Sequence, residues 1–389
     1  MIANIPQGCV AAAQEKWVLG AQQAAIDLLL AAINAHGAVK PKPLLIQFAY
    51  YLSLLGDWAA AARVFADTIT QHGPDWQVYK NTAVARNKPG DYAGAIADLL
   101  RAQALQPDDF YIQDGLAHAY YHLRQYESAT SAGISALTLK DAAARRPATQ
   151  PTRPAQYAGT DKIIAFSLWG RHPRYLRGAL RNALLIDDLY PGWRARFYLD
   201  ATVPQDFRDT LASLGADLRL MPAEAASGEK LTWRFLVAND PAIDRFLVRD
   251  CDSVIGMREA QAVAAWIASG KSFHAMRDWW THTDLILAGM WGGKAGMLPD
   301  LHALWRAYVP GLMPTANVDQ WFLRDRVWPL IRDDALVHDR CYRVPGSLPF
   351  PSPDPPGEAH VGQDEFAAAR ARQTSLLVAW IARLPILAA

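Results

Sequence analysis

The chain has 389 residues, of which 51% are hydrophobic and 20% are charged, and its formal net charge is +1. This composition predicts a packed globular protein rather than a disordered one, and the length is sufficient for two domains. The near-neutral charge provides no overall attraction to nucleic acid or to an anionic membrane, and we expect no nucleic acid as a partner.

The cysteines indicate a reducing compartment. Cys9, Cys251 and Cys341 are far apart and lack C-x-x-C spacing, so neither a disulfide scaffold nor a structural zinc site is expected. The N-terminus has no signal-peptide pattern. The apolar stretch 376–389 is too short to span a bilayer. We therefore expect a cytoplasmic protein without a transmembrane segment, in which this stretch packs on the protein or touches a membrane surface.

The first third of the chain repeats with a 34-residue period. An aromatic residue, an alanine three positions later and a second alanine recur at Trp58, Tyr92 and Tyr126, at Ala61, Ala95 and Ala129, and at Ala49, Ala83 and Ala117. This pattern resembles the tetratricopeptide repeat over residues 43–143, and small residues let paired helices approach closely. Residues 10–36 form a further helical stretch, out of register. We expect residues 1–143 to bind a protein or peptide, or to serve as a scaffold that could mediate homo-oligomerisation.

Residues 144–160 contain three prolines among small and polar residues, which indicates a linker. Beyond it, short apolar runs alternate with segments of helical periodicity. We expect strands at 162–168, 194–199, 217–221, 246–248 and 272–276, and helices at 174–189, 206–214, 233–238 and 258–268. This alternation predicts a mostly parallel sheet in an α/β domain over residues 161–389. The sequence lacks a G-x-G-x-x-G after the first strand and a P-loop, so dinucleotide and P-loop sites lose their main support.

The most informative motif follows the fourth predicted strand, where the apolar run 246–248 leads into Arg249, Asp250, Cys251 and Asp252. Ligands of open α/β sheets bind outside the carboxyl ends of the strands. Two carboxylates at such an end attract a hard divalent cation, which prefers oxygen ligands. The alternative is a pair of acids that caps the loop.

Several motifs in order resemble those of a GT-A glycosyltransferase, the Rossmann-like fold of nucleotide-diphospho-sugar transferases. They are Ser167-Leu168-Trp169-Gly170, Asp250-Cys251-Asp252, Leu287-Ala288-Gly289-Met290-Trp291-Gly292-Gly293, Asn317-Val318-Asp319-Gln320 and Val337-His338-Asp339. The order is similar to that of bacterial sugar transferases with a metal-binding Asp-x-Asp, and it covers residues 162–343. It implies a nucleotide-diphosphate sugar as donor, Mn²⁺ or Mg²⁺ as cofactor, and a protein, peptide or glycan as acceptor.

The resemblance also implies roles for single residues. The metal ligands would be Asp250, Asp252 and His338. The catalytic residues would be Asp319, as an acceptor-side carboxylate and candidate base, and Asp250. The donor would be bound by Ser167, Trp169, Arg249, Asp250, Gly292, Gly293 and Lys294. His338 has a structural histidine as its alternative, and Asp319 a first-turn acid favoured by the helix dipole.

Two other functions remain open. In the first, the repeats are the functional part of a non-catalytic interaction protein and the α/β domain is degenerate. The second is a phosphohydrolase of the haloacid dehalogenase type, with Asp250 as nucleophile. We rank it lower because the motif follows the fourth strand instead of opening the domain.

Overall fold

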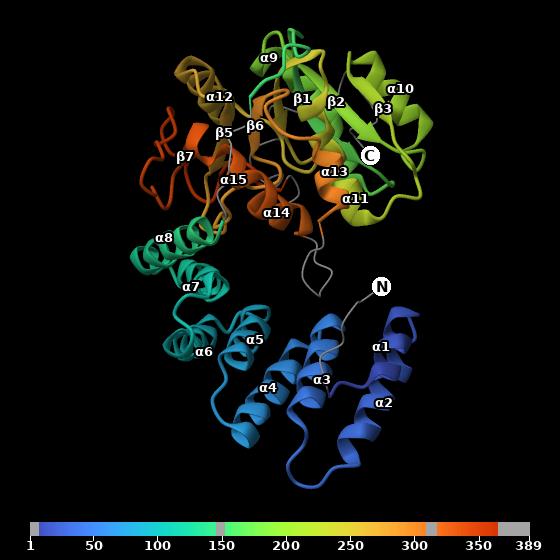
Figure 1. Ribbon diagram of the computed structural model, residues 1–389, viewed down its shortest axis with the longest axis vertical. Helices are drawn as coiled ribbons and strands as arrows, with labels where there is room; N and C mark the ends of the chain where they lie inside the picture. Colours follow the sequence, from blue (N-terminus) through green and yellow to red (C-terminus); the bar gives the residue numbers. More distant parts are fainter. Residues whose placement is uncertain (1–7, 145–151, 309–316, 365–389) are drawn as a thin grey trace. The chain divides into compact units, whose positions relative to one another are not determined.

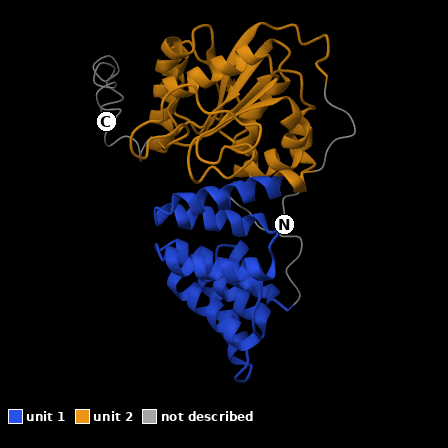
Figure 2. Cartoon of the chain, turned by 90° about the vertical axis from the view of Figure 1, so that its left-hand side faces the viewer, with its two compact units in different colours: residues 1–140 blue, residues 141–389 orange. Residues whose placement is uncertain are grey.

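The computed structural model describes residues 8–144, 152–308 and 317–364. The chain separates into two compact units, Met1–Lys140 and Asp141–Ala389 (Figure 2). Within the described ranges, no helix has the length and apolar character needed to cross a bilayer. The apolar stretch 376–389 lies outside the described residues.

The described chain up to residue 144 consists of eight helices (Figure 1). They are α1 (Ala11–Val18), α2 (Gln22–Asn34), α3 (Lys42–Leu54), α4 (Trp58–His72), α5 (Trp76–Asn87), α6 (Tyr92–Leu105), α7 (Phe110–His122) and α8 (Tyr126–Ala143). The aromatic residue of each repeat begins α4, α6 or α8. All six repeated alanines are fully buried, as expected for small residues at close helix contacts. The tetratricopeptide-like repeat is therefore confirmed, with α1 and α2 as the additional helical stretch.

Aspartates set the starts of four helices in this unit. Asp57, Asp75, Asp91 and Asp109 each precede a helix, and each side chain accepts a backbone N–H from the first turn. Such a cap satisfies one of the amides that a helix N-terminus leaves without a partner. Asp57 and Asp91 are 34 residues apart, and so are Asp75 and Asp109. The sequence period therefore fixes the helix boundaries as well as the core.

The second unit contains a seven-stranded sheet of order β3-β2-β1-β4-β6-β5-β7. The strands are β1 (Asp161–Leu168), β2 (Arg194–Leu199), β3 (Asp217–Leu220), β4 (Ile243–Val248), β5 (Phe273–Arg277), β6 (Trp291–Lys294) and β7 (Ala335–Asp339). All pairings are parallel except those of β6, which runs antiparallel to β4 and β5. The mostly parallel sheet is confirmed, whereas β6 falls in a glycine-rich stretch for which the sequence predicted no strand.

Helices cover both faces of this sheet (Figure 1). One face packs against α9 (Pro173–Leu189), α10 (Gln205–Ser213) and α12 (Met257–Ser269) in a continuous apolar core. The other faces the 3-10 helix η1 (Trp233–Asn239), where the ring of Phe235 lies against Trp291 and Phe322. Beside η1 lie the shorter helices α11 (Ser227–Thr232), α13 (Leu301–Arg306) and α14 (Val318–Phe322), the last continued by a π-helical turn (Leu323–Val327) and α15 (Trp328–Ile331). This is the layered arrangement typical of α/β domains.

Candidate functional site

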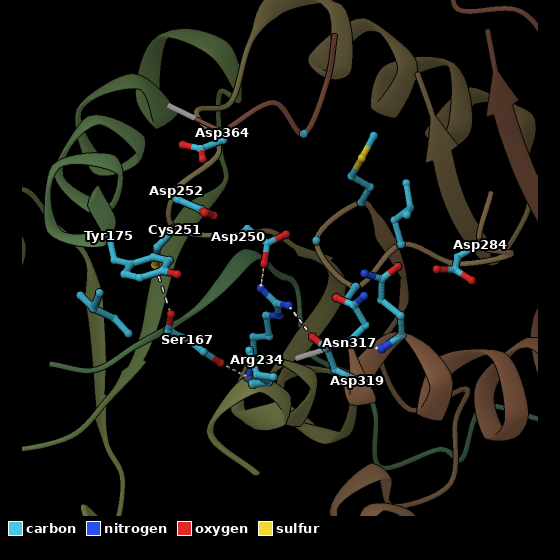
Figure 3. Close-up of a pocket in the computed structure, with 18 of the residues that line it drawn as sticks. Ser167, Tyr175, Arg234, Asp250, Cys251, Asp252, Asp284, Asn317, Asp319 and Asp364 are labelled. Carbon is cyan, nitrogen blue, oxygen red and sulfur yellow. Dashed lines mark hydrogen bonds and ion pairs between the residues drawn. The ribbon is translucent and has the colours of Figure 1, made fainter. Parts of the chain in front are cut away.

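A cavity of about 570 Å³ lies at the carboxyl ends of β1 and β4 (Figure 3). These strands are parallel neighbours, so both end at the same edge of the sheet. The cavity has the size typical of small-molecule sites and the position typical of ligand crevices in α/β sheets. Its charged lining residues are Asp250, Asp252, Asp284, Asp319, Asp364, Arg174 and Arg234. Ser167 and Trp169, both predicted to contact the donor, also line it.

Gly289 reaches the cavity because β6 runs antiparallel to β4, so the segment before β6 arrives at the edge where β4 ends. A Cβ atom on Gly289 would lie 1.9 Å from Oδ2 of Asp250. No other side chain fits there while Asp250 holds this position. The glycine thus keeps one oxygen of the first aspartate open to the cavity.

Contacts with α9 fix the loop that carries Asp250 and Asp252. A Cβ atom on Gly178 would come within 1.8 Å of the Cys251 carbonyl oxygen, so helix and loop are in direct contact. Nδ2 of Asn182 donates to the carbonyl of Ser253 at 2.9 Å. The buried Cys251 thiol donates to the Ser167 carbonyl at 3.2 Å, and burial raises its pKa well above the usual value. Cys251 therefore has a structural role, and the loop is held rigidly.

Arg234, a residue that the sequence analysis did not identify, joins the two candidate catalytic acids. Its guanidinium donates to Oδ1 of Asp250 through Nη1 and to Oδ2 of Asp319 through Nη2, the latter at 3.0 Å (Figure 3). Its backbone N–H donates to Oγ of Ser167 at 3.0 Å. Arg234 is 3% exposed, so its guanidinium is almost out of contact with water. They hold the ends of β1, β4 and α14 around a single cation.

Asp319 lies in the first turn of α14, lines the cavity and is 4% exposed. Burial raises the pKa of its carboxyl group, and the positive charge of Arg234 opposes this shift. A raised pKa brings a carboxylate closer to the range in which it can act as a base near neutral pH. The geometry is compatible with this use and with a first-turn helix acid.

Asp252 is paired with a second cation. Nη2 of Arg174, near the start of α9, lies 2.5 Å from Oδ2 of Asp252 and 2.7 Å from Oδ2 of Asp364. Burial raises the pKa of Asp252, the charge of Asp250 adds to the increase, and Arg174 opposes it. Asp364 also belongs to an antiparallel bridge with Ser253, which holds it beside the acidic loop. Neither Arg174 nor Asp364 was predicted from the sequence.

Four residues predicted to bind the donor lie outside the cavity lining. Arg249 is buried, and its Nε donates to Oε1 of Glu259 at 3.0 Å, so its charge is already paired within the core. Gly292 and Gly293 belong to β6. A Cβ atom there would lie 2.4 Å from the Phe246 carbonyl and 2.5 Å from the Phe273 ring, respectively. These glycines permit close packing within the sheet, and Lys294 ends the same strand.

His338 does not join the aspartates. It is buried in β7, and its Nδ1 lies 2.8 Å from Nε2 of His274. Burial lowers the pKa of His338 to about 4, and its ring lies 5.5 Å from that of Phe350. The structure therefore corrects the expected ligand set in favour of the alternative, a structural histidine paired in the core.

Asp250 and Asp252, the two remaining candidate ligands, suit a hard cation whose coordination shell is completed by the substrate. Within the described ranges, no three His, Cys, Asp or Glu side chains are grouped closely enough to form a full ligand set. Asp250 and Asp252 offer only oxygen donors, and Gly289 leaves space at one of them. Mg²⁺ commonly binds through one or two carboxylates plus substrate phosphates and water, so the residues present fit such an ion.

No protein-family model and no curated protein matches this chain. Among solved structures, MamA from Desulfovibrio magneticus RS-1 is 24% identical over 33% of this chain and 71% of its own, with a TM-score of 0.31. A mutant Thermobaculum terrenum O-GlcNAc transferase is 17% identical over 58% of this chain and 42% of its own, with a TM-score of 0.37. The Sgt2 TPR domain from Aspergillus fumigatus is 15% identical over 26% of this chain and 66% of its own, with a TM-score of 0.25. The likeness is partial in every case, so the function has to follow from the geometry of the cavity.

Proposed function

We propose that the second unit is a metal-dependent glycosyltransferase of the GT-A type, which moves a sugar from a nucleotide-diphosphate donor to an acceptor hydroxyl. The observation that carries this proposal is the convergence of Asp250, Asp252 and Asp319 on one cavity at the carboxyl ends of β1 and β4. The three acids come from two segments far apart in the sequence. The order of sequence motifs, which resembles that of GT-A glycosyltransferases, supports the same function.

The charge of the cavity favours a cation-dependent donor. Five aspartates and two arginines line it, so carboxylates outnumber cationic side chains. A diphosphate would be repelled by this surface unless a divalent cation accompanied it. Asp250 and Asp252 would hold Mn²⁺ or Mg²⁺, and the bound ion would neutralise charge on the leaving diphosphate.

The protein residues divide the remaining tasks. Asp319 would accept the proton of the acceptor hydroxyl, and Arg234 would hold Asp319 and Asp250 in a fixed relation. Ser167 and Trp169, at the end of β1, would contact the nucleotide side of the donor. Preorganised charges of this kind contribute to catalysis because they need no rearrangement during the reaction.

The helical unit would bind the acceptor or assemble copies of the chain. Stacked helix pairs expose a continuous surface that suits an extended segment of another protein. We therefore propose a protein, peptide or glycan acceptor and place the reaction in the cytoplasm. A chain that uses only this surface, with an inactive second unit, is the competing proposal.

A thermal-shift screen of nucleoside diphosphates and nucleotide sugars, with and without Mn²⁺, tests the function. A ligand at about 100 times its Kd stabilises the folded state by about 2.7 kcal/mol. We expect stabilisation by one nucleotide class only when Mn²⁺ is present, together with slow Mn²⁺-dependent hydrolysis of the sugar donor. Asp252→Asn should abolish both effects, whereas Asp209→Asn, an exposed substitution on α10, should preserve them. If no nucleotide binds with Mn²⁺, the non-catalytic interaction protein becomes the better account.

A further inference from the structure

Arg174 makes contacts that the proposed reaction does not require. A single nitrogen, Nη2, contacts a carboxylate oxygen of both Asp252 and Asp364, at 2.5 Å and 2.7 Å. Figure 3 shows these two aspartates at the same side of the cavity, away from Asp319. The positive charge of Arg174 thus lies beside Asp252, at the position that a metal ion would take if Asp252 were its ligand.

Among the described residues, Arg174 places a positive charge between Asp252 and Asp364. Asp250 and Asp252 flank a single residue, and the bridge between Ser253 and Asp364 brings a third carboxylate to the same loop. The other arginine of the cavity, Arg234, is already shared between Asp250 and Asp319. Arg174 is therefore the counter-ion of the Asp252 corner in the free protein.

Arg174 also has hydrogen-bonding capacity that the two aspartates do not use. Its side chain is 35% exposed, and its Nε, a buried atom, has no hydrogen-bond partner among the described residues. Its guanidinium lies 5.4 Å from the ring of Tyr175, another lining residue. A guanidinium with an unpaired edge can bind a phosphate through two parallel hydrogen bonds.

We propose that Arg174 holds the place of the divalent cation in the free protein and transfers to the donor diphosphate when the cation binds Asp252. This inference rests on the proposed function. A guanidinium and a divalent ion cannot both contact the same oxygen of Asp252 without strong repulsion. Binding of the ion therefore releases Arg174 beside the incoming phosphates. Arg174 thereby makes cation binding and nucleotide binding depend on each other.

The test separates binding of the ion from binding of the nucleotide. Mn²⁺ alone is titrated into the full chain and followed by electron paramagnetic resonance of free Mn²⁺. UDP and GDP are then titrated at saturating Mn²⁺ by calorimetry. Arg174→Gln should bind Mn²⁺ alone about tenfold more tightly, because a competing cation is gone, and the nucleotide about tenfold more weakly, each equivalent to about 1.4 kcal/mol. A purely structural role would weaken both.

Two matched variants complete the experiment. Arg174→Lys keeps the competing charge but loses the bidentate fork, so its Mn²⁺ affinity should stay near that of the wild type while nucleotide affinity falls. Arg177→Gln removes the same charge from the same helix at a position outside the cavity lining, and should change Mn²⁺ affinity less than Arg174→Gln. If the wild type binds Mn²⁺ and nucleotide but Arg174→Gln does not tighten Mn²⁺, this inference is refuted alone. If neither protein binds Mn²⁺, with or without nucleotide, the proposed function fails with it.

Discussion

Replacing Arg234 by methionine removes the cation that lies between Asp250 and Asp319. The two partners differ in exposure. The Asp319 side chain is 5% exposed, whereas the Asp250 side chain is 43% exposed. Breaking a buried pair leaves an uncompensated charge and costs about 3–5 kcal/mol, whereas a pair open to water contributes about 1 kcal/mol or less. We therefore expect Arg234→Met to lower the free energy of unfolding by about 4 kcal/mol at pH 7, mainly through Asp319.

The pH dependence gives a second readout. Burial already raises the pKa of Asp319, and loss of Arg234 should raise it further. A carboxyl group whose pKa is higher in the folded state destabilises the fold as pH rises above its unfolded value, so the deficit should shrink in acid. The expected change is at most about 1.4 kcal/mol per pH unit. Urea unfolding at several pH values measures it.

Second-site variants identify which partner is responsible. Asp319→Asn in the Arg234→Met background removes the buried charge and should restore at least about 2 kcal/mol. Asp250→Asn in the same background is the matched control and should restore less than about 1 kcal/mol. A loss below about 1 kcal/mol in the single variant, or equal rescue by both asparagines, would refute the electrostatic role assigned to Arg234.

Three further predictions concern other parts of the chain. Gly289→Ala should weaken Mn²⁺-dependent nucleotide binding by up to about 100-fold while the protein stays folded, because the added methyl group displaces the Asp250 carboxylate; calorimetry measures it, and unchanged affinity contradicts the close approach. In the folded protein the pKa of His338 is about 4, below the unfolded value near 6.5. The neutral imidazole therefore contributes fully to the free energy of unfolding above pH 6.5, and this contribution declines by at most about 1.4 kcal/mol per pH unit towards pH 4. Urea unfolding should show a shallower acid slope for His338→Gln, and an unchanged slope argues against a neutral buried imidazole. Asp109→Ala should cost about 1–2 kcal/mol in thermal unfolding through loss of the α7 cap, and Asp109→Asn clearly less; equal losses would assign the effect to the pair with Lys80.

The parts of the fold that the sequence predicted well have a strong local signal. The strand expected at 194–199 coincides with β2, and the repeated alanines are buried as their spacing indicated. Strand β6 has no such signal, because Gly292 and Gly293 are glycines for packing reasons that involve Phe246 and Phe273 from other strands. In the sequence alone, two adjacent glycines are typical of a loop.

In the candidate site, too, the residues with a strong local signal were predicted and the others were not. Asp250 and Asp252 were predictable because an apolar strand leads directly into them, and both line the cavity. Arg234 was not, because its partners follow 16 and 85 residues later and a single arginine in a short 3-10 segment has no periodic context. Arg174 depends on Asp364, which comes from the far end of the described chain. Contacts across such separations arise only from the tertiary fold.

The period of the helical unit has a consequence for how such a chain can change its length. Trp58 and Tyr92 begin equivalent helices, and each follows an aspartate cap 34 residues from the next. Removal or duplication of residues 58–91 would rejoin the chain in frame, with an aspartate cap, an aromatic residue and an alanine in equivalent positions at the new junction. Because each repeat contacts mainly its neighbours, such an event preserves every type of interface. Evolution could therefore lengthen or shorten this scaffold in whole units without altering the strands that carry the acidic cavity.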